Sequence, residues 1–330
     1  MSTDYSKHLI ETVRASRRKL KPRQRAKPPK IVPVMYPYAI ERRYAKTIYS
    51  YVSPLIEAVN AYIEKHGEAL LRGDSADHIS RAGNMIPHAD AIPGTGFKLL
   101  TATLTSWVGQ YFPEQNQGGS QVYMGAGSEA DAVKLFADAQ WAKQMAGALG
   151  VSFNTAETWW PDLRSRWAQD NYRLIKSFAT EYITKVNYAA EQAIINGVSY
   201  NTLKKQIQEL GDVSGVSETW SRNKARFLAR DQIGKLQGQI NQAQQTEVGA
   251  GWYTWLTTGD KRVRPSHAAM EGLLGRWDDA SVYSDDGGKT WKPKTSGMVK
   301  LHPGQDYQCR CTAIPYWKNI LAIADYGLAA

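Results

Sequence analysis

The feature that most constrains the fold is an apolar repeat with a spacing of three and four residues, which recurs over long stretches of the chain. It runs over residues 36–71, 161–197 and 221–249, and a shorter helix is expected at 199–210. This spacing places the apolar side chains on one face of a helix. The sequence therefore predicts a mostly helical N-terminal and central body with long helices.

Local signals refine the ends of these helices. Ser128 and Asp131 resemble a capping box, which predicts that a helix begins there and continues to about Leu149. Pro54 is expected either to start a second helix or to kink the first one. Glycines punctuate residues 72–127, which are interpreted as loops around one helix.

The pattern changes after Gly251. Residues 252–257 are aromatic and β-branched, as is typical of a strand, and a turn at Gly259-Asp260 would return the chain as a second strand at 261–264. Residues 309–314 are interpreted as the last strand. The fold class predicted for the whole chain is α+β, with a small C-terminal α+β domain and a short antiparallel sheet after the helical body.

The chain is expected to divide into four regions. These are a basic extended arm over 1–35, a helical region with glycine-rich loops over 36–158, a long-helix region over 159–250, and the small domain over 251–330. No apolar stretch approaches the roughly 18 residues of a membrane span, and the first residues lack a secretory apolar core. A membrane or secreted protein is therefore not expected, and two cysteines exclude a disulfide framework.

The net charge of +10 is concentrated at the start of the chain. Residues 1–35 carry ten basic and two acidic side chains, a net of +8, whereas the other 295 residues carry +2. Four prolines and the shortage of large apolar residues after Leu20 predict an extended arm. Such an arm can neutralise phosphates without reading bases, bind an acidic protein surface, or act only as a solvated tail. The candidate DNA-contacting residues are Arg14, Arg17, Arg18, Lys19, Lys21, Arg23, Arg25, Lys27 and Lys30.

A distinctive order of motifs runs through the last third of the chain. The pieces are Ala-Arg-Asp-Gln at 229–232, Tyr-Thr-Trp at 253–255, Asp-Lys-Arg-Val-Arg-Pro-Ser-His at 260–267, His-Pro-Gly at 302–304 and Cys-Arg-Cys at 309–311. Over roughly residues 160–316 this order resembles the phage Mu F-like minor head proteins, also called phage head morphogenesis proteins. Two departures stand out. Asp231-Gln232 occupies the place where the family has Thr-Glu, and the stretch before His302 lacks the usual double proline.

The resemblance implies a structural protein of a tailed-bacteriophage head. Such a minor capsid protein would lie in the virion interior at or near the portal vertex, after a stage in the host cytoplasm, and would aid procapsid assembly. Its implied partners are the portal protein and/or the major capsid protein, and packaged double-stranded DNA, with several copies per virion and no membrane in the assembled head. Residues 73–158 have no counterpart in the resemblance.

Four side chains of this string are candidate zinc ligands. His267, His302, Cys309 and Cys311 have the number and chemistry of a tetrahedral structural site. Alternate positions of a strand point to one face, so both sulfurs could reach one ion, although the Cys-X-Cys spacer is shorter than usual. The alternative is that the histidines form hydrogen bonds across a small core while the cysteines pack as small apolar residues.

Charged residues of the same string are interpreted as a structural polar network, because buried charges must be paired. Its members are Arg230, Asp231, Asp260, Arg262 and Arg264. One alternative is a metal-dependent nuclease or transferase-like enzyme that uses Arg230, Asp260 and the two histidines. No nucleophile elbow or His-Glu-X-X-His motif occurs, so a non-enzymatic role is preferred and no catalytic residue is assigned. Another alternative is a plain non-specific DNA-binding protein.

Overall fold

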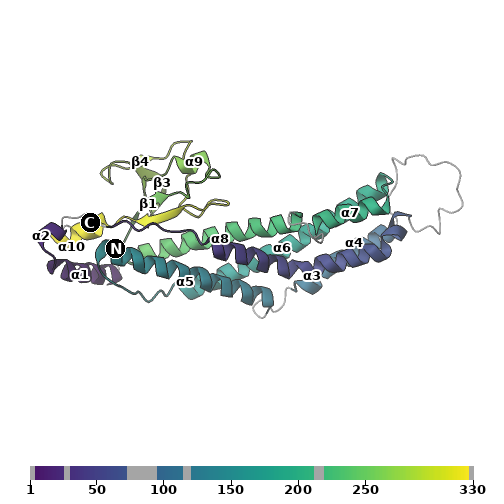
Figure 1. Ribbon diagram of the computed structural model, residues 1–330, viewed down its shortest axis with the longest axis horizontal. Coiled ribbons are helices and arrows are strands. Elements are labelled where there is room, and N and C mark those ends of the chain that lie inside the picture. Colours follow the sequence, from purple (N-terminus) through teal and green to yellow (C-terminus); the bar gives the residue numbers. More distant parts are fainter. Residues whose placement is uncertain (1–3, 26–29, 73–94, 114–119, 212–218, 327–330) are drawn as a thin grey trace. The chain divides into compact units, whose positions relative to one another are not determined.

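The structure is a computed structural model that describes residues 4–25, 30–72, 95–113, 120–211 and 219–326 (Figure 1). Within these residues the chain forms ten helices and one five-stranded antiparallel sheet near its C-terminal end. The predicted α+β class, with a helical body followed by a small sheet, is therefore confirmed.

The contacts of the chain define two compact units, each assembled from segments that are distant in sequence. Unit 1 contains residues 1–41, 128–165 and 230–330, and unit 2 contains residues 42–127 and 166–229. Several long helices contribute residues to both units. The four-region division made from the sequence stays a prediction.

Unit 2 is built from helices. It takes residues from α3 (Tyr38–Leu71), α4 (Thr95–Tyr111), the start of α5 (Gln121–Leu149), α6 (Trp160–Ile195), α7 (Tyr200–Leu210) and the start of α8 (Trp220–Glu247). The long helices lie where the apolar spacing predicted them, and α3 continues through Pro54 as one helix. Inside the unit, the buried Tyr44 hydroxyl donates to Asn171 Oδ1 at 2.7 Å. Ser199 caps α7 by accepting a hydrogen bond from the Thr202 backbone N–H.

The predicted start of α5 is wrong. The helix begins at Gln121, and Ser128 lies inside it. Val122, Ala126 and Ala130 are all buried and stand four residues apart on one face of this helix. Their burial supports the helix through a stretch whose glycines had suggested a loop.

The sheet of unit 1 has the strand order β4-β3-β2-β1-β5, and all of its pairs are antiparallel. The strands are β1 (Trp252–Leu256), β2 (Leu274–Arg276), β3 (Asp279–Ser284), β4 (Lys292–Pro293) and β5 (Thr312–Pro315). A short helix, α9 (Pro265–Ala268), lies in the connection between β1 and β2. The register pairs Trp255 with Ala313, and Tyr253 with Gly275.

The second strand predicted at 261–264 is not formed. The neighbours of β1 are β2 and β5, and residues 257–264 form an irregular turn that leads into α9. The Asp260 carboxylate stabilises this turn because it accepts a hydrogen bond from the Arg262 backbone N–H at 2.9 Å. Cys309 and Cys311 likewise precede β5 instead of lying on it.

The alternation of side chains along the strands gives the sheet two different faces. One face packs into a cluster that we call the sheet core, whose members are Tyr253, Trp255, Met270, Trp277, Val299, Cys309, Cys311 and Ala313. The opposite face carries Thr254 and Ile314, which are register partners.

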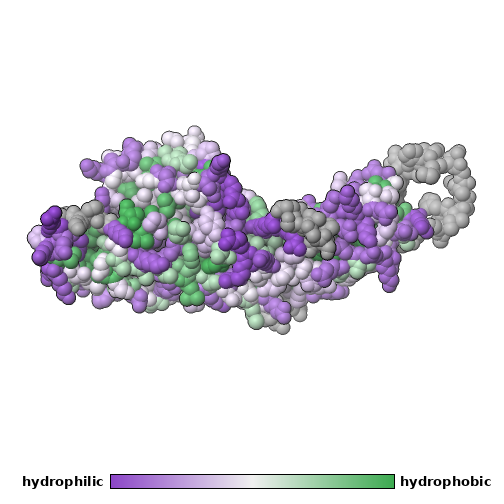
Figure 2. Space-filling view, viewed as in Figure 1, coloured by the Kyte–Doolittle hydropathy of each residue, from purple (hydrophilic) through white to green (hydrophobic). Residues whose placement is uncertain are grey.

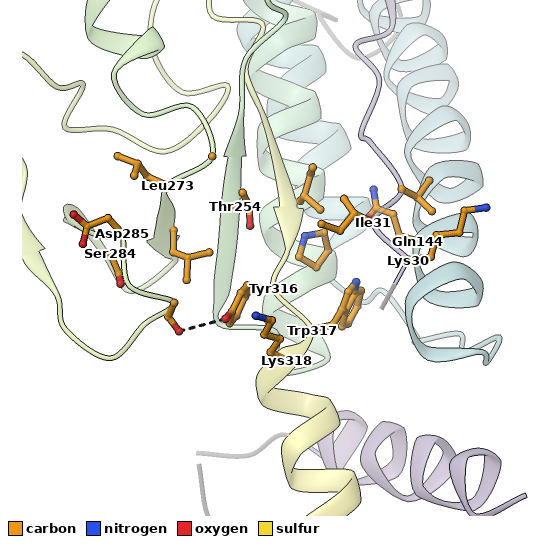
Figure 3. A pocket seen from close by; sticks show the side chains of 16 residues that line it. Lys30, Ile31, Gln144, Thr254, Leu273, Ser284, Asp285, Tyr316, Trp317 and Lys318 are labelled. Atoms are coloured by element: carbon orange, nitrogen blue, oxygen red, sulfur yellow. Dashed lines mark hydrogen bonds between the residues drawn. The ribbon is translucent and has the colours of Figure 1, made fainter. Parts of the chain in front are cut away.

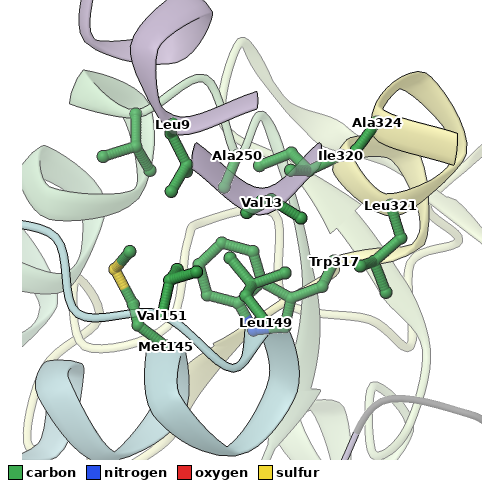
Figure 4. Packing of buried hydrophobic residues seen from close by; sticks show 11 residues of the cluster. Leu9, Val13, Met145, Leu149, Val151, Ala250, Trp317, Ile320, Leu321 and Ala324 are labelled. Atoms are coloured by element: carbon green, nitrogen blue, oxygen red, sulfur yellow. The ribbon is translucent and has the colours of Figure 1, made fainter. Parts of the chain in front are cut away.

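The basic segment at the start of the chain departs from the predicted extended arm. Asp4–Arg18 forms helix α1, and Pro22–Arg25 forms the single turn α2. Leu9 and Val13 lie one helical turn apart and are fully buried against Trp317 and helix α10 (Lys318–Tyr326), as Figure 4 shows. These two side chains supply the apolar contact that the prediction of an arm overlooked. Residues 30–37 are extended, and Lys27 lies outside the described residues.

Among the residues that the structure describes, none of the helices combines the length and the apolar character that crossing a membrane would require.

Candidate functional site

The structure brings together three of the four predicted zinc ligands. Helix α9 places His267 in the sheet core, where its Nδ1 lies 3.4 Å from Cys311 Sγ and 3.5 Å from Cys309 Sγ. One ligand atom from each residue lies within 4.8 Å of the others, and all three side chains are buried. We call these residues the His-Cys-Cys cluster.

A carboxylate holds the other side of the His267 ring. Asp306 Oδ2 lies 2.8 Å from His267 Nε2 and also accepts from Arg264 Nη2 at 2.8 Å. The Arg264 guanidinium, which can only donate, also lies 2.8 Å from Nε2, so this nitrogen has one donor and one acceptor beside it while Nδ1 faces the two sulfurs. Burial lowers the pKa of His267, but its contacts with Cys309 and Asp306 raise it more, so the pKa lies above its usual value.

The two thiols of the cluster are not equivalent. Cys309 Sγ accepts from the Cys311 backbone N–H at 3.4 Å and also faces His267. Hydrogen bonding from Cys311 and His267 outweighs burial and holds the pKa of the Cys309 thiol well below its usual value. Contact with Cys309 and burial raise the pKa of Cys311. Cys309 is therefore the thiol that becomes a thiolate first.

The fourth predicted ligand, His302, has different partners. Its Nδ1 lies 3.0 Å from the Tyr253 hydroxyl, and its ring packs against Trp277 with a centroid separation of 5.1 Å. Burial and the nearby Lys294 ammonium lower the pKa of His302 to about 4, so the ring is neutral near pH 7. The cluster that could hold a metal ion contains His267 and the two cysteines without His302.

Residues 302–311, which we call the 302–311 loop, lie directly on helix α8. A Cβ atom added to Gly238 would stand 2.7 Å from the Pro303 carbonyl oxygen, and one added to Gly234 would clash with the Cys309 carbonyl. Gly304 has a φ of +85°, which favours glycine. The His-Pro-Gly motif therefore serves a close approach between backbone segments.

The predicted polar network separates into several pairs. Asp260 binds both guanidinium nitrogens of Arg310, with Nη2 to Oδ1 at 2.8 Å, and this lowers the pKa of Asp260 to about 2. Arg264 binds Asp306, as described above. The Arg262 backbone N–H binds Asp260, and the Arg262 side chain is exposed.

The α8 members of that network use further partners. Arg230 Nε lies 3.3 Å from Glu41 Oε1, and Asp231 pairs with Lys235 at 2.6 Å. Asp231 Oδ1 also accepts from the Gln308 backbone N–H at 2.9 Å and so ties the 302–311 loop to α8. These residues act as local structural contacts.

The enzymatic alternative required Arg230, Asp260, His267 and His302 to meet. Each of them has a different main partner in the structure, namely Glu41, Arg310, Asp306 and Tyr253. In the part of the chain that the structure describes, these contacts do not bring the four residues together.

A groove in unit 1 lies against the face of the sheet that carries Thr254 and Ile314. It has a volume of about 510 Å³ and is mostly lined by apolar side chains, among them Ile31, Leu273 and Trp317 (Figure 3). Tyr316 donates to the Gly287 carbonyl at its rim, at 3.2 Å. Lys30 is the one predicted site residue that lines it.

The predicted DNA-contacting residues fall into two groups. Arg14 donates to the Ala324 carbonyl, and Arg17 forms a bidentate pair with Asp325 at 2.6 and 2.7 Å, so both secure α1 to α10. The side chains that remain exposed are Arg18, Lys19, Lys21, Arg23, Arg25 and Lys30. Figure 2 shows hydrophilic atoms gathered around α2, which carries two of them.

Comparison with known sequences places these sites in a family. The profile described as "Phage Mu protein F like protein" matches residues 184–314, which contain the His-Cys-Cys cluster and the 302–311 loop. Residues 184–314 are therefore similar to the Mu F-like family. The resemblance stated from the motif order is thereby confirmed for this part of the chain.

The Mu F-like region also has a curated relative. An uncharacterized protein of Haemophilus influenzae is 34% identical over 149 residues, which cover 45% of this chain and 28% of that protein. The match therefore spans less than a third of the relative's length. No solved structure matches the chain.

Sequence reasoning missed several residues that build the site. Asp306 gave little signal, because a single carboxylate in a polar loop is common. Gly234 and Gly238 carried a usable signal, since two small residues four positions apart on a helix permit close backbone approach. Arg310 was passed over between the two cysteines, although it forms the buried partner of Asp260.

Proposed function

We propose that this protein is a minor capsid, or head morphogenesis, protein of a tailed bacteriophage. The observation that carries the proposal is the Mu F-like match over residues 184–314. In this proposal the protein lies inside the head at or near the portal vertex and aids procapsid assembly. Its protein partners are the portal protein and/or the major capsid protein, and several copies enter each virion.

The family match also favours a structural role over an enzymatic one. The family is one of head morphogenesis proteins, and the residues of the enzymatic alternative have separate partners. We therefore propose a non-enzymatic protein.

Contact with packaged DNA is the second part of the proposal. Six of the basic side chains predicted to contact DNA are exposed, and basic side chains bind duplex DNA through its phosphates without sequence choice. Arg14 and Arg17 are engaged by α10, so we expect them to contribute less than the exposed group.

The location is tested on purified particles. Quantitative mass spectrometry of procapsids and of mature heads should find the protein in a low, fixed ratio to the portal protein. Its absence from both particles would overturn the proposal. Crosslinking within the procapsid then identifies whether the portal or the major capsid protein is its neighbour.

The DNA contact is tested by neutralising exposed charges. We expect Lys19→Gln, Lys21→Gln and Arg23→Gln together to weaken duplex binding and to reduce the slope of log K against log[salt] by up to about 3, about 0.9 for each lost phosphate contact. Fluorescence anisotropy with a salt series measures both quantities.

The matched control removes the same charge elsewhere. Lys46→Gln, Lys143→Gln and Lys205→Gln together neutralise three other exposed lysines and should leave the salt slope unchanged. If the first triple variant binds like the wild type, the basic segment does not contact DNA and an acidic protein surface becomes its partner.

A further inference from the structure

In the His-Cys-Cys cluster one histidine nitrogen lies at nearly the same distance from two cysteine sulfurs, an arrangement that hydrogen bonding alone does not require. We propose that this cluster binds one zinc ion through His267 Nδ1, Cys309 Sγ and Cys311 Sγ, with a water-sized fourth ligand and with Asp306 as the positioning residue of the histidine. This site lies within the Mu F-like region, and the inference does not depend on where the protein sits in a phage head.

The distances between the ligand atoms agree with a tetrahedral zinc site. Zinc bonds of about 2.3 Å to sulfur and about 2.0–2.1 Å to nitrogen, at tetrahedral angles, separate the nitrogen from each sulfur by about 3.5 Å. The observed separations from His267 Nδ1 are 3.4 Å to Cys311 Sγ and 3.5 Å to Cys309 Sγ. Both nitrogen-to-sulfur separations therefore match those of a tetrahedral zinc site, and the three ligand atoms lie within 4.8 Å of one another.

The direction of the ring nitrogen also favours a metal. Asp306 and Arg264 both lie 2.8 Å from Nε2, and Nδ1 faces two sulfurs at nearly equal distance. Nδ1 makes one good hydrogen bond, as donor or as acceptor, so a purely hydrogen-bonded core would favour one sulfur over the other. A carboxylate behind a histidine is also the arrangement that orients zinc-bound histidines in other proteins.

The fourth position has room for a small ligand. A cavity of about 20 Å³ adjoins the cluster and is lined by all three ligand residues together with Thr258, Val263 and the loop around Arg310. That volume accommodates about one water molecule. His302, which the sequence had offered as the fourth ligand, is instead bound to Tyr253.

Thiolate and imidazole ligands both suit zinc, whose tetrahedral sites commonly combine them. His267 is 2% exposed, Cys309 3% and Cys311 7%, so the ion would be enclosed by protein. Bound there, zinc would join α9 to the end of the 302–311 loop, which Asp231 and Gly234 hold on α8. The ion would thus fasten the sheet core to the long helix.

Metal analysis of the full chain tests the site. The protein is purified without chelators from zinc-supplemented cells, and zinc is measured by inductively coupled plasma mass spectrometry. We expect about one zinc per chain in the wild type. Cys309→Ser and Cys311→Ser should each lose most of it.

The matched control is His302→Asn, which replaces a buried histidine of the same domain. The structure predicts that this variant keeps its zinc, whereas the four-ligand set inferred from the sequence predicts that it loses it. Loss of zinc from folded His302→Asn, or retention of zinc by both cysteine variants, would overturn the three-ligand site.

A second measurement does not depend on any variant folding. Cobalt(II) added to wild-type protein stripped of metal should give a thiolate-to-cobalt charge-transfer band in the near ultraviolet and intense tetrahedral ligand-field bands. Wild-type protein that contains no zinc and develops neither band overturns the proposal. A Cys309–Cys311 disulfide in the native protein would do the same.

The role of Asp306 has its own test. Asp306→Asn weakens the hydrogen bond to Nε2, so we expect zinc affinity to fall about 10–100-fold while the cobalt spectrum keeps its thiolate band. Competition with a chromophoric chelator measures the affinity. Asp285→Asn, at an exposed carboxylate paired with Lys292, is the control and should leave the affinity unchanged.

Discussion

His267 and His302 are both buried histidines of the same small domain, and their surroundings are opposite in character. His267 faces two sulfurs on one side and a carboxylate on the other. His302 faces the Tyr253 hydroxyl and the Trp277 ring, near the Lys294 ammonium. The first environment raises the pKa of its histidine and the second lowers it.

The difference shows that residue type alone did not decide which histidine belongs with the cysteines. Both histidines stand in the same string of motifs, and both can act as metal ligands. The partner of the second ring nitrogen separates them, because Asp306 binds His267 Nε2 while no carboxylate is bonded to His302 in the contacts of the described residues.

The largest loss of stability is expected when the aromatic packing around His302 in the sheet core is removed. Trp277 is buried, and its indole N–H donates to Gln245 Oε1 at 2.9 Å. Trp277→Ala removes the ring packed on His302 and leaves the Gln245 oxygen without its donor. We expect a loss of about 3–5 kcal/mol in the free energy of unfolding, measured by urea denaturation.

Trp291→Ala is the comparison variant for this effect. Trp291 is half-buried and contacts Trp252 at a centroid separation of 5.1 Å. Its replacement should cost about 1–2 kcal/mol. Equal costs for the two variants would mean that the surroundings of His302 are not a tightly packed core, and the contrast with His267 would lose its basis.

The next effect is the dependence of stability on pH. The pKa of His302 falls from about 6.5 in the unfolded chain to about 4 in the fold, because burial and Lys294 disfavour the charged ring and Asp278 and Asp279 only partly compensate. The unfolded state therefore binds more protons between these values. The stabilising contribution is fully present above pH 6.5 and is lost as the pH falls towards 4.

The loss over this window should reach at most about 3 kcal/mol, which is the shift converted at 1.36 kcal/mol per pKa unit. His302→Asn removes the titrating ring and should flatten the stability curve between pH 4 and 6.5. Urea denaturation at a series of pH values measures both proteins. If the free energy of unfolding of the variant depends on pH as steeply as that of the wild type, the pKa of His302 is not lowered by burial and Lys294.

The sequence predicted the parts of this fold that depend on local spacing. Helices α3 and α6 lie where the apolar repeat placed them, because each buries a continuous stripe of its own residues. Helix α1 escaped prediction because the partner of Leu9 and Val13 is α10, at the far end of the chain. The strand β2 escaped for a similar reason, since Leu-Gly-Arg at 274–276 has little strand propensity and depends on pairing with β1.

The same distinction applies to the site. His267, Cys309 and Cys311 could be selected from the sequence because few side chain types bind soft metals. The sequence could not show that His302 lies outside the His-Cys-Cys cluster or that Asp306 binds His267. Both facts follow from the path of the 302–311 loop over α8. That path depends on the two glycines beneath it.

The smallest loss of stability is expected for Gly238→Ala, which tests the path of the 302–311 loop over α8. Gly238 lies in a helix, where alanine is normally favoured by about 0.5–1 kcal/mol, but a Cβ at this position would approach the Pro303 carbonyl oxygen. Gly238→Ala should therefore destabilise the protein by about 1–3 kcal/mol, because the loop backbone must move. Gly109→Ala is the matched control, since Gly109 lies in α4 with nothing within 4 Å of its added Cβ, and it should instead stabilise the protein.

Because Gly238 lies beneath the Pro303 end of the loop and Gly234 beneath the Cys309 end, Gly238→Ala should disturb the surroundings of His302 more than those of His267. Histidine NMR resonances of the variant measure this, and equal shifts of both rings would show that the two surroundings move as one.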